Sequence, residues 1–132
     1  MLEELLAAWQ EFAKRHVFIF RAVDPVLYEL RAPGYLRAII DNSSVEMMAD
    51  KDGHLRACLV YSRHPGSDET TVHWAWTATK CRNLGLQREL WAKVGITPAS
   101  VVVISCLTVV SERMKDKYGW MYWPGIINER NA

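Results

Sequence analysis

Cysteine is scarce in this sequence, and the few that occur form no recognisable pair. They are Cys58, Cys81 and Cys106, an odd number with no Cys-x-x-Cys spacing. Disulfide scaffolds and redox motifs depend on paired cysteines, so we expect three reduced thiols in a reducing compartment. A chain of 132 residues, of which 50% are hydrophobic, can bury enough surface to fold without a disulfide or a structural metal.

Long apolar runs are also missing. The longest covers only residues 99–110 and contains serine and threonine, whereas a helix that crosses a membrane needs about 20 apolar residues. The first residues, Met1-Leu2-Glu3-Glu4, carry acids where a secretory signal peptide carries bases. We therefore expect a soluble protein of the cytoplasm, or one carried inside a particle, with no membrane as partner.

Neither sign of charge predominates. Lys and Arg number 16 and Asp and Glu number 15, which gives a net charge of +1. Proteins that bind nucleic acids present clustered basic residues to the phosphates. The balanced charge disfavours nucleic acid as a partner, although it leaves local basic patches open.

The chain contains no internal repeat and no low-complexity tract, and its length fits one domain. Two stretches near the start have helical character. In the first, apolar residues recur at helical spacing: Leu2, Leu5, Leu6, Trp9, Phe12, Ala13 and His16. In the second, Asp24 is placed to cap a helix that begins at Pro25. Residues 32–34, Ala-Pro-Gly, predict an interruption, after which a short helix covers about residues 35–40.

The middle of the chain changes from helical spacing to strand formers. Residues 45–49, 54–62 and 70–77 predict three strands, the last of them dominated by β-branched and aromatic residues. Turn residues separate these strands, including Asp52-Gly53. Strands joined by such short turns form an antiparallel meander.

The last third of the chain alternates between helix and strand. A break at residues 78–84 precedes a helix that ends near residue 93. The apolar run 99–106 fits a strand buried on both faces, as in parallel pairing. A helix over residues 108–118 and a short strand over residues 120–123 follow. The apolar stripe of that helix consists of Val110, Met114 and Tyr118.

The resulting order, α-α-β-β-β-α-β-α-β, predicts an α/β fold in which an antiparallel meander is followed by a buried strand in parallel pairing. We expect a single domain over residues 1–132. Its parts are N-terminal helices at 1–40, a sheet and loop region at 43–94, and a C-terminal β-α-β unit at 99–124.

One segment between the third predicted strand and the next helix carries a motif, Arg82-Asn-Leu-Gly85-Leu-Gln87. It resembles the acetyl-CoA motif of the GNAT superfamily of N-acetyltransferases, Arg/Gln-x-x-Gly-x-Gly/Ala. Arg82 and Gly85 match, and Gln87 replaces the small third residue. The element order over about residues 45–122 matches the superfamily as well. The tail, residues 118–124, is similar to small GNAT-like proteins of tailed bacteriophages.

This resemblance implies acetyl-CoA as the cofactor. In the family, amides of this loop hold the coenzyme pyrophosphate at a helix N-terminus, where unpaired N–H groups and the helix dipole favour anions. The backbone of the preceding strand pairs with the pantetheine arm. The implied contacts are Trp76, Thr77, Arg82, Asn83, Leu84, Gly85, Leu86 and Gln87. The alternative interpretation is an ordinary helix cap in which Gly85 fits a tight turn.

Acetyl transfer to an amine needs a base for the amine proton. Many family members use a glutamate on the third strand, and the matching stretch offers His73 instead, a residue type that titrates near neutrality. Strand alternation would place His73 with Ala75 and Thr77 on one face, and Trp74 and Trp76 on the other. The alternative interpretation is a histidine packed inside the sheet.

The transfer also needs an acid for the leaving thiolate. The family's usual tyrosine lies in the last helix, four residues before a glycine, and here that position is Lys115, while Tyr118 directly precedes Gly119. Tyr118 is our candidate acid. The alternatives are water as the proton donor, and a Tyr118 that only anchors the helix to the core. The displaced acid argues against a competent enzyme.

The sequence predicts no metal site. His54 and Cys58 are four residues apart, which in a strand separates them by about 13 Å, too far for one zinc ion. No Ser-His-Asp or Cys-His set can be recognised from spacing.

Two functions fit these observations. The first is an acetyl-CoA-binding N-acetyltransferase that modifies an unknown amine, such as a protein lysine, an N-terminus or a small molecule. The second is a phage protein with an inactive GNAT fold that binds a protein partner in the virion, during packaging or on a host factor. Gln87, Lys115 and the shortened chain ends favour the second function. Both functions are compatible with a homo-oligomer.

The two functions predict different surfaces. An enzyme should show an open cleft beside the third strand, with free amides at residues 83–87. A binding module should show that cleft filled by Trp76 or Gln87, together with an exposed apolar patch. An exposed Trp120 or Trp123 would mark such a patch, because tryptophan is enriched in the centres of interfaces.

Overall fold

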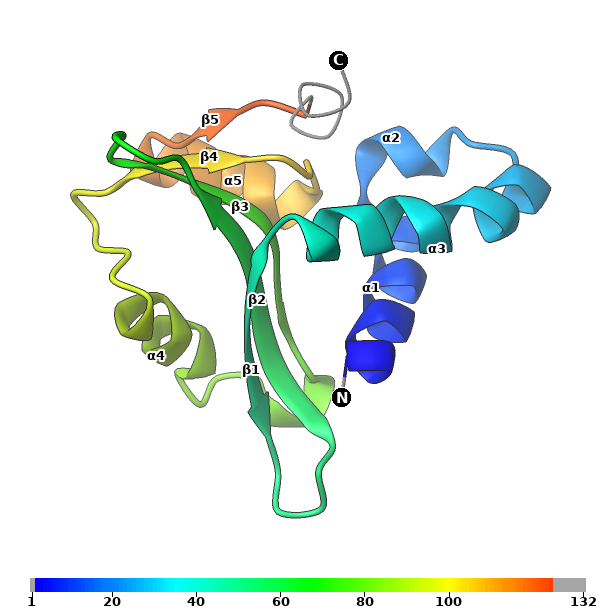
Figure 1. Ribbon diagram of the computed structural model, residues 1–132, viewed down its shortest axis with the longest axis horizontal. Coiled ribbons are helices and arrows are strands. Elements are labelled where there is room, and N and C mark those ends of the chain that lie inside the picture. The colour runs from blue at the N-terminus through cyan, green and yellow to red at the C-terminus, as the bar shows by residue number, and fades with distance from the viewer. Residues whose placement is uncertain (1, 125–132) are drawn as a thin grey trace.

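The computed structural model describes residues 2–124, which form a five-stranded sheet with helices on both of its faces (Figure 1). Three helices precede the sheet: α1 (Leu2–His16), α2 (Phe18–Arg21) and α3 (Pro25–Asp41). The strands are β1 (Ser44–Ala49), β2 (Leu55–Arg63), β3 (Glu69–Thr77), β4 (Val101–Ile104) and β5 (Met121–Tyr122). The remaining helices are a short 3-10 helix (Thr79–Cys81) and α4 (Leu86–Lys93), both between β3 and β4, and α5 (Val109–Tyr118), between β4 and β5.

The sheet is mixed. Its strand order is β1-β2-β3-β4-β5; β1, β2 and β3 pair in antiparallel fashion, and β4 is parallel to both β3 and β5. The predicted α/β class, with a meander followed by a parallel-paired strand, is confirmed. A parallel connection needs a crossover, and here α4 and α5 supply one each.

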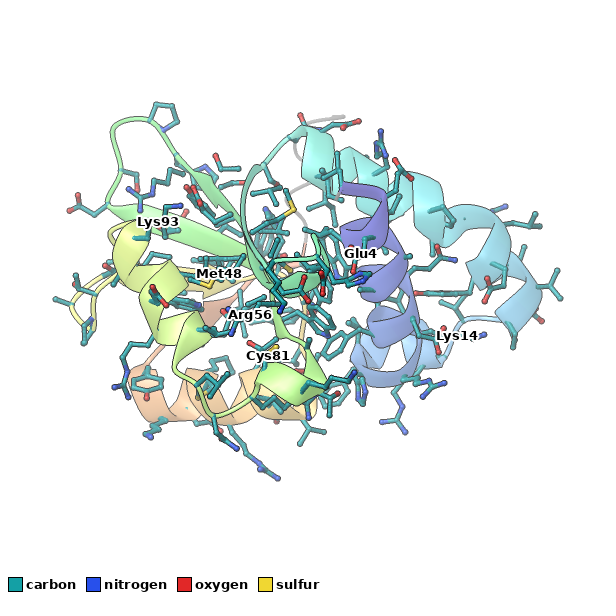
Figure 2. All side chains as sticks on the ribbon, turned by 90° about the horizontal axis from the view of Figure 1, so that it is seen from below. Glu4, Lys14, Met48, Arg56, Cys81 and Lys93 are labelled. Carbon is teal, nitrogen blue, oxygen red and sulfur yellow. The ribbon has the colours of Figure 1, made fainter. Side chains whose placement is uncertain are left out.

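Each face of the sheet has its own helices. α1 and α3 lie on one side of the strands and α4 on the other (Figure 1). Seen from below, Glu4 and Lys14 of α1 lie on one side and Lys93 of α4 on the other (Figure 2). Glu4 Oε1 accepts a hydrogen bond from Leu55 N at 3.0 Å, which ties α1 to the start of β2. None of the helices within residues 2–124 is long and apolar enough to cross a membrane.

The predicted amphipathic stripe of α1 is confirmed. Leu5, Trp9 and Ala13 are fully buried against the sheet. The ring of Trp9 stacks on that of Trp74 in β3, with centroids 5.3 Å apart. An aromatic pair adds about 0.5–1.5 kcal/mol to the burial of its two rings, so this stack is one of the contacts that hold α1 on the sheet.

The predicted interruption at residues 32–34 is wrong, because α3 continues through Pro33. An interior proline costs about 3 kcal/mol through one lost hydrogen bond and a steric clash. α3 buries residues on both sides of the proline, Tyr28 and Ala32 before it and Leu36 and Ile39 after it. Their burial outweighs the local cost. The predicted start is confirmed, since the side chain of Asp24 caps α3 by accepting from Val26 N at 2.9 Å.

The last helix differs from its prediction. α5 has no buried residue, and its supposed core stripe of Val110, Met114 and Tyr118 is exposed. α5 is stabilised at its N-terminus instead, where Thr108 and Ser111 form a capping box. Tyr118 is therefore half exposed and is not itself part of the core.

One buried tyrosine joins α3 to α1 and gives the fold a sensitivity to alkali. The Tyr28 hydroxyl donates to the carbonyl oxygen of Gln10. Burial, and then the charges of Glu29 and Glu11, raise the pKa of Tyr28 from 10.0 to about 12. The unfolded chain therefore releases this proton at lower pH than the folded protein does. The stability that results is fully present below pH 10.0 and is lost as the pH rises to about 12.

We expect the urea midpoint of the wild type to fall more steeply between pH 10 and 12 than that of Tyr28→Phe. Phenylalanine fills nearly the same space and cannot ionise, so its variant lacks this contribution to the pH dependence. Urea titrations of both proteins at half-unit pH steps measure the difference. Parallel curves over this window would contradict the assignment.

Candidate functional site

The pairing of β3 with β4 ends in the middle of the sheet. β4 pairs only with residues 69–72 of β3, and the last link is the Ser105 amide, which donates to Val72 O at 3.1 Å. β3 continues for five more residues, to Thr77, without a strand on that side in the described part of the chain. Ala75 in this stretch is exposed, because the helices leave it uncovered. Backbone pairing between the two strands therefore stops at Val72. The region beyond it, between the end of β3 and the turn after β4, is called the opening below.

The backbone direction of β3 decides which residues face this opening. The Ala78 amide donates across to Arg56 O of β2 at 2.8 Å. Successive residues of a strand direct their backbone groups to opposite edges, so Trp76 faces β2, whereas Ala75 and Thr77 face the opening. Of the two predicted pantetheine contacts, only Thr77 lies at this edge. Ala75 is the contact that sequence reasoning missed.

The loop before α4 is exposed, and its backbone has a geometry that suits an anion. Gly85 caps the helix in the left-handed conformation, φ 74°, and no side chain satisfies the cap. The amides of residues 83–88 meet no hydrogen-bond acceptor within residues 2–124. Lys80, Arg82 and Arg88 lie exposed around them. Unpaired amides at a helix N-terminus, with added positive charge, favour phosphate groups.

Gln87 points away from this loop and into the fold. Its Nε2 donates to Trp76 O at 2.7 Å and to Cys58 O at 3.1 Å, and its Oε1 accepts from Trp91 Nε1 at 3.1 Å. The substitution that weakens the motif match thus ties the start of α4 to β2 and β3. It leaves the loop amides uncovered.

Tyr118 belongs to an aromatic stack on the α4 side of the sheet. Its ring lies 5.4 Å from that of Trp120, which lies 5.2 Å from that of Trp91. Trp120 packs against the core beneath α4. The Tyr118 side chain is 48% exposed, so its hydroxyl is accessible to solvent or a ligand.

A β-bulge changes the face on which His73 lies. The register between β2 and β3 shifts so that Val60 opposes Trp74 and Tyr61 opposes Val72, which leaves His73 as the extra residue. A bulge breaks the alternation of a strand locally and re-aims a side chain. The predicted grouping of His73 with Ala75 and Thr77 is therefore wrong.

His73 is buried beside α3, on the same face as Trp74. The side chain is 3% exposed. Its Nε2 lies 3.0 Å from Ser62 Oγ, whose own neighbour is Ser43 at the end of α3. Its Nδ1 lies 2.6 Å from Ser105 Oγ. His73 and Tyr118, the two predicted catalytic residues, are thus on opposite faces of the sheet.

Ser105 and Cys106 are site residues that sequence reasoning missed, because they were assigned to the strand. β4 ends at Ile104, so both residues lie in the turn that leads to α5. Burial raises the pKa of the Cys106 thiol from 9.0 to about 11. Tyr35 and Tyr122 lie nearby: burial, and then the neighbouring Cys106 and Tyr122 groups, raise the pKa of Tyr35. These groups form the α3 side of the opening.

A separate polar pocket of about 400 Å³ lies at the other end of β3. It is formed by the turn between β2 and β3 and by the connection from α4 to β4, including Arg63, Asp68, Glu69, Thr97 and Ser100. It includes neither the loop before α4 nor His73. No group of three potential metal ligands gathers within residues 2–124.

No protein-family model and no curated protein matches this sequence. Among solved structures, a candidate acetyl transferase from Pyrococcus furiosus matches with a TM-score of 0.56 over 99% of this chain and 86% of that chain, at 13% sequence identity. A tetramutant of a Bacillus halodurans protein matches with a TM-score of 0.45 over 89% of this chain and 79% of that chain, at 18% identity. The first match shows that this chain shares its fold with that protein, in agreement with the α/β class expected from the sequence.

We expect Gln87→Leu to destabilise the protein by about 1–3 kcal/mol, because leucine keeps the volume but leaves the Trp91 indole N–H without its acceptor. Urea denaturation measures the loss. The neighbouring, exposed Arg88→Ala is the matched control and should lie within about 0.5 kcal/mol of the wild type. Equal midpoints for Gln87→Leu and the wild type would show that Gln87 does not anchor α4.

Proposed function

We propose that this protein is an acetyl-CoA-dependent N-acetyltransferase that modifies an amine. The observation that carries the proposal is a single arrangement of backbone groups. The unpaired amides of residues 83–88 stand at the N-terminus of α4, beside a β3 edge that is unpaired beyond Val72. A thioester linked through a long amide-containing arm to a pyrophosphate matches both features in order. The likeness of the fold to a candidate acetyl transferase supports the proposal.

Each part of the coenzyme has a counterpart in the chain. The pyrophosphate would accept hydrogen bonds from the loop amides, and Lys80 and Arg82 would offset its charge. The amides of the pantetheine arm would pair with the backbone of Ala75 and Thr77 at the open edge. The thioester would then reach the place where β3 and β4 separate, next to Ser105.

The two faces of the sheet would serve opposite steps of the transfer. His73 lies on the α3 face, and we propose that it receives the proton that the transfer releases. Tyr118 lies on the α4 face, exposed beside the helix that holds the coenzyme. This is the side from which the thiolate would leave, so Tyr118 stays our candidate acid, with water as the alternative donor.

A second candidate function, a module that binds a protein partner, is favoured by apolar residues at the surface. Leu30 of α3 is 73% exposed, and Val26, one turn before it, is exposed as well. Met121 and Trp123 are exposed at the opposite end of the chain. The resemblance of the tail to phage proteins stays a prediction in both cases. Binding of the coenzyme separates the two functions.

We expect the wild type to bind acetyl-CoA with micromolar affinity in a calorimetric titration and Gly85→Glu to lose this binding. The glutamate would place a negative charge where the proposal places a pyrophosphate. The added Cβ meets no atom within 4 Å, so the variant is not sterically blocked from folding.

Gly53→Glu is the matched control. Gly53 also has a positive φ, 86°, and open space around it, but it lies in the β1–β2 hairpin. Both variants therefore carry the same charge and a similar left-handed strain of about 1–2 kcal/mol. Gly53→Glu should bind like the wild type. The absence of binding by the wild type at millimolar acetyl-CoA would reject the enzyme and favour the binding module.

A further inference from the structure

Three hydroxyl groups and one imidazole form a continuous line of hydrogen bonds on the α3 face of the sheet. Ser43 Oγ donates to Ile39 O at 2.6 Å and lies 3.2 Å from Ser62 Oγ. Ser62 Oγ lies 3.0 Å from Nε2 of His73, and Nδ1 of the same ring lies 2.6 Å from Ser105 Oγ. The line runs from the end of α3 to the point where β3 and β4 separate.

One arrangement of protons satisfies every hydrogen bond along this line. A serine hydroxyl has one proton and a neutral imidazole has one N–H. The proton of Ser43 is used on Ile39 O, so the proton of Ser62 points to Ser43 or to the Asn42 carbonyl oxygen. Ser62 therefore accepts from Nε2–H of His73. Nδ1 is then an acceptor, and the Ser105 hydroxyl donates its proton to it.

Ser105 thus has the surroundings of an activated nucleophile. Its proton is already shared with a base whose second nitrogen is held by another group, the arrangement that activates serine in acyl transfer. His73 is buried, whereas Ser105 is only partly buried, so Ser105 is the more exposed member of the pair.

The turn that holds Ser105 also supplies hydrogen-bond donors. Ser105 follows the last residue of β4, and the cap of α5 is Thr108, so the serine sits on a strand–turn–helix connection. The amides of Cys106 and Leu107, directly after it, meet no acceptor in the part of the chain that the structure describes. Backbone amides next to a nucleophilic serine are the groups that hold the oxyanion in acyl-transfer enzymes.

We propose that Ser105 accepts the acetyl group and carries it as an ester before the amine takes it, an inference that relies on the proposed function for the identity of the thioester. Ser105 Oγ attacks the thioester carbonyl carbon while its proton passes to Nδ1 of His73. The C–S bond breaks, the C–O bond remains, and the thiolate leaves with the proton that His73 took from Ser105, so the ring is neutral again before the amine arrives.

In the second half the amine attacks the ester carbonyl. The C–N bond forms, the C–O bond to Ser105 breaks, and the amine proton returns through His73 to Ser105 Oγ. Two successive transfers need no ternary complex, so the coenzyme can occupy the α4 face and leave before the amine arrives on the α3 face. Cys106 is the competing nucleophile, and its raised pKa disfavours it because the thiol stays protonated near neutral pH.

The test needs no knowledge of the acceptor. The full-length protein is mixed with acetyl-CoA, or with p-nitrophenyl acetate, and no amine is added. Intact mass and peptide mapping should show one acetyl group on Ser105, and the nitrophenyl ester should release one equivalent of nitrophenol in a burst. Ser105→Ala should abolish both signals. His73→Gln should slow the burst by about 10²–10⁴-fold.

Three further variants separate the nucleophile from its neighbours. The exposed Ser44→Ala should be acetylated like the wild type, because Ser44 does not belong to the hydrogen-bonded line. Ser62→Ala should slow acetylation without weakening acetyl-CoA binding, and Ser62→Thr should restore the rate, since Ser62 acts by orienting the ring. Circular dichroism confirms that each variant is folded, and peptide mapping of the wild type gives the answer without any variant.

The outcomes distinguish this inference from the proposed function. Acetyl on Ser105 from either donor supports the nucleophile. Acetyl only on Cys106 or on lysines overturns it. No acetylation by either donor, in a protein that still binds acetyl-CoA, overturns the nucleophile and leaves the N-acetyltransferase standing. A burst with p-nitrophenyl acetate in a protein that does not bind acetyl-CoA supports Ser105 as the nucleophile and contradicts acetyl-CoA as the coenzyme.

Discussion

The early end of the β3–β4 pairing is the constraint on which the rest of this structure depends. β4 is only four residues long, and its last residue lies opposite Val72, in the middle of β3. A longer β4 would bond to the free edge of Ala75 and Thr77 and would carry Ser105 into the sheet. Because the strand stops there, the edge stays open and the turn after β4 stands directly beside His73. The proposed coenzyme path and the proposed nucleophile are therefore consequences of a single strand end.

Polar side chains keep the two halves of this opening in place. On the α4 face, Gln87 bonds to carbonyl oxygens of both β2 and β3, and Trp91 and Trp120 continue the contact to the end of α5. On the α3 face, His73 joins β2 to the turn after β4. These bonds are made inside or at the edge of the core, where an unpaired partner is costly. The site is thus held by specific hydrogen bonds on both faces and, on the α4 face, by ring stacking as well.

Local sequence signals predicted the parts of the fold that local interactions determine. The three strands and the turn residues of the meander, the apolar stripe of α1 and the cap at Asp24 each appear in the structure as expected. The loop between β3 and α4 was also located correctly, because Gly85 marks both a helix start and a positive φ. The amphipathic spacing of α5 predicted a buried stripe, and this prediction is wrong because the stripe faces outward.

The candidate functional residues depend on longer-range relations that no local pattern encodes. A register shift between β2 and β3 decides on which face of the sheet His73 lies. Ser105 lies outside β4 because the pairing of β4 with β3 ends one residue earlier, at Ile104. α3 passes through Pro33 only because the helix is buried on both sides of it. Gln87 was treated as a defect of a motif, although its side chain anchors α4 to strands distant in sequence. Each of these features requires two segments to be placed before either can be interpreted.

The central claim is that the open edge of β3 and the start of α4 form one continuous binding surface. Amide chemical shifts measured by NMR during a titration with acetyl-CoA test it most directly. The account predicts large shifts at Ala75, Thr77 and residues 83–88, a smaller change at Ser105, and none in the β1–β2 hairpin. Shifts centred instead on Thr97 and Ser100, in the separate pocket at the other end of β3, with Ala75 and Thr77 unchanged, would contradict it.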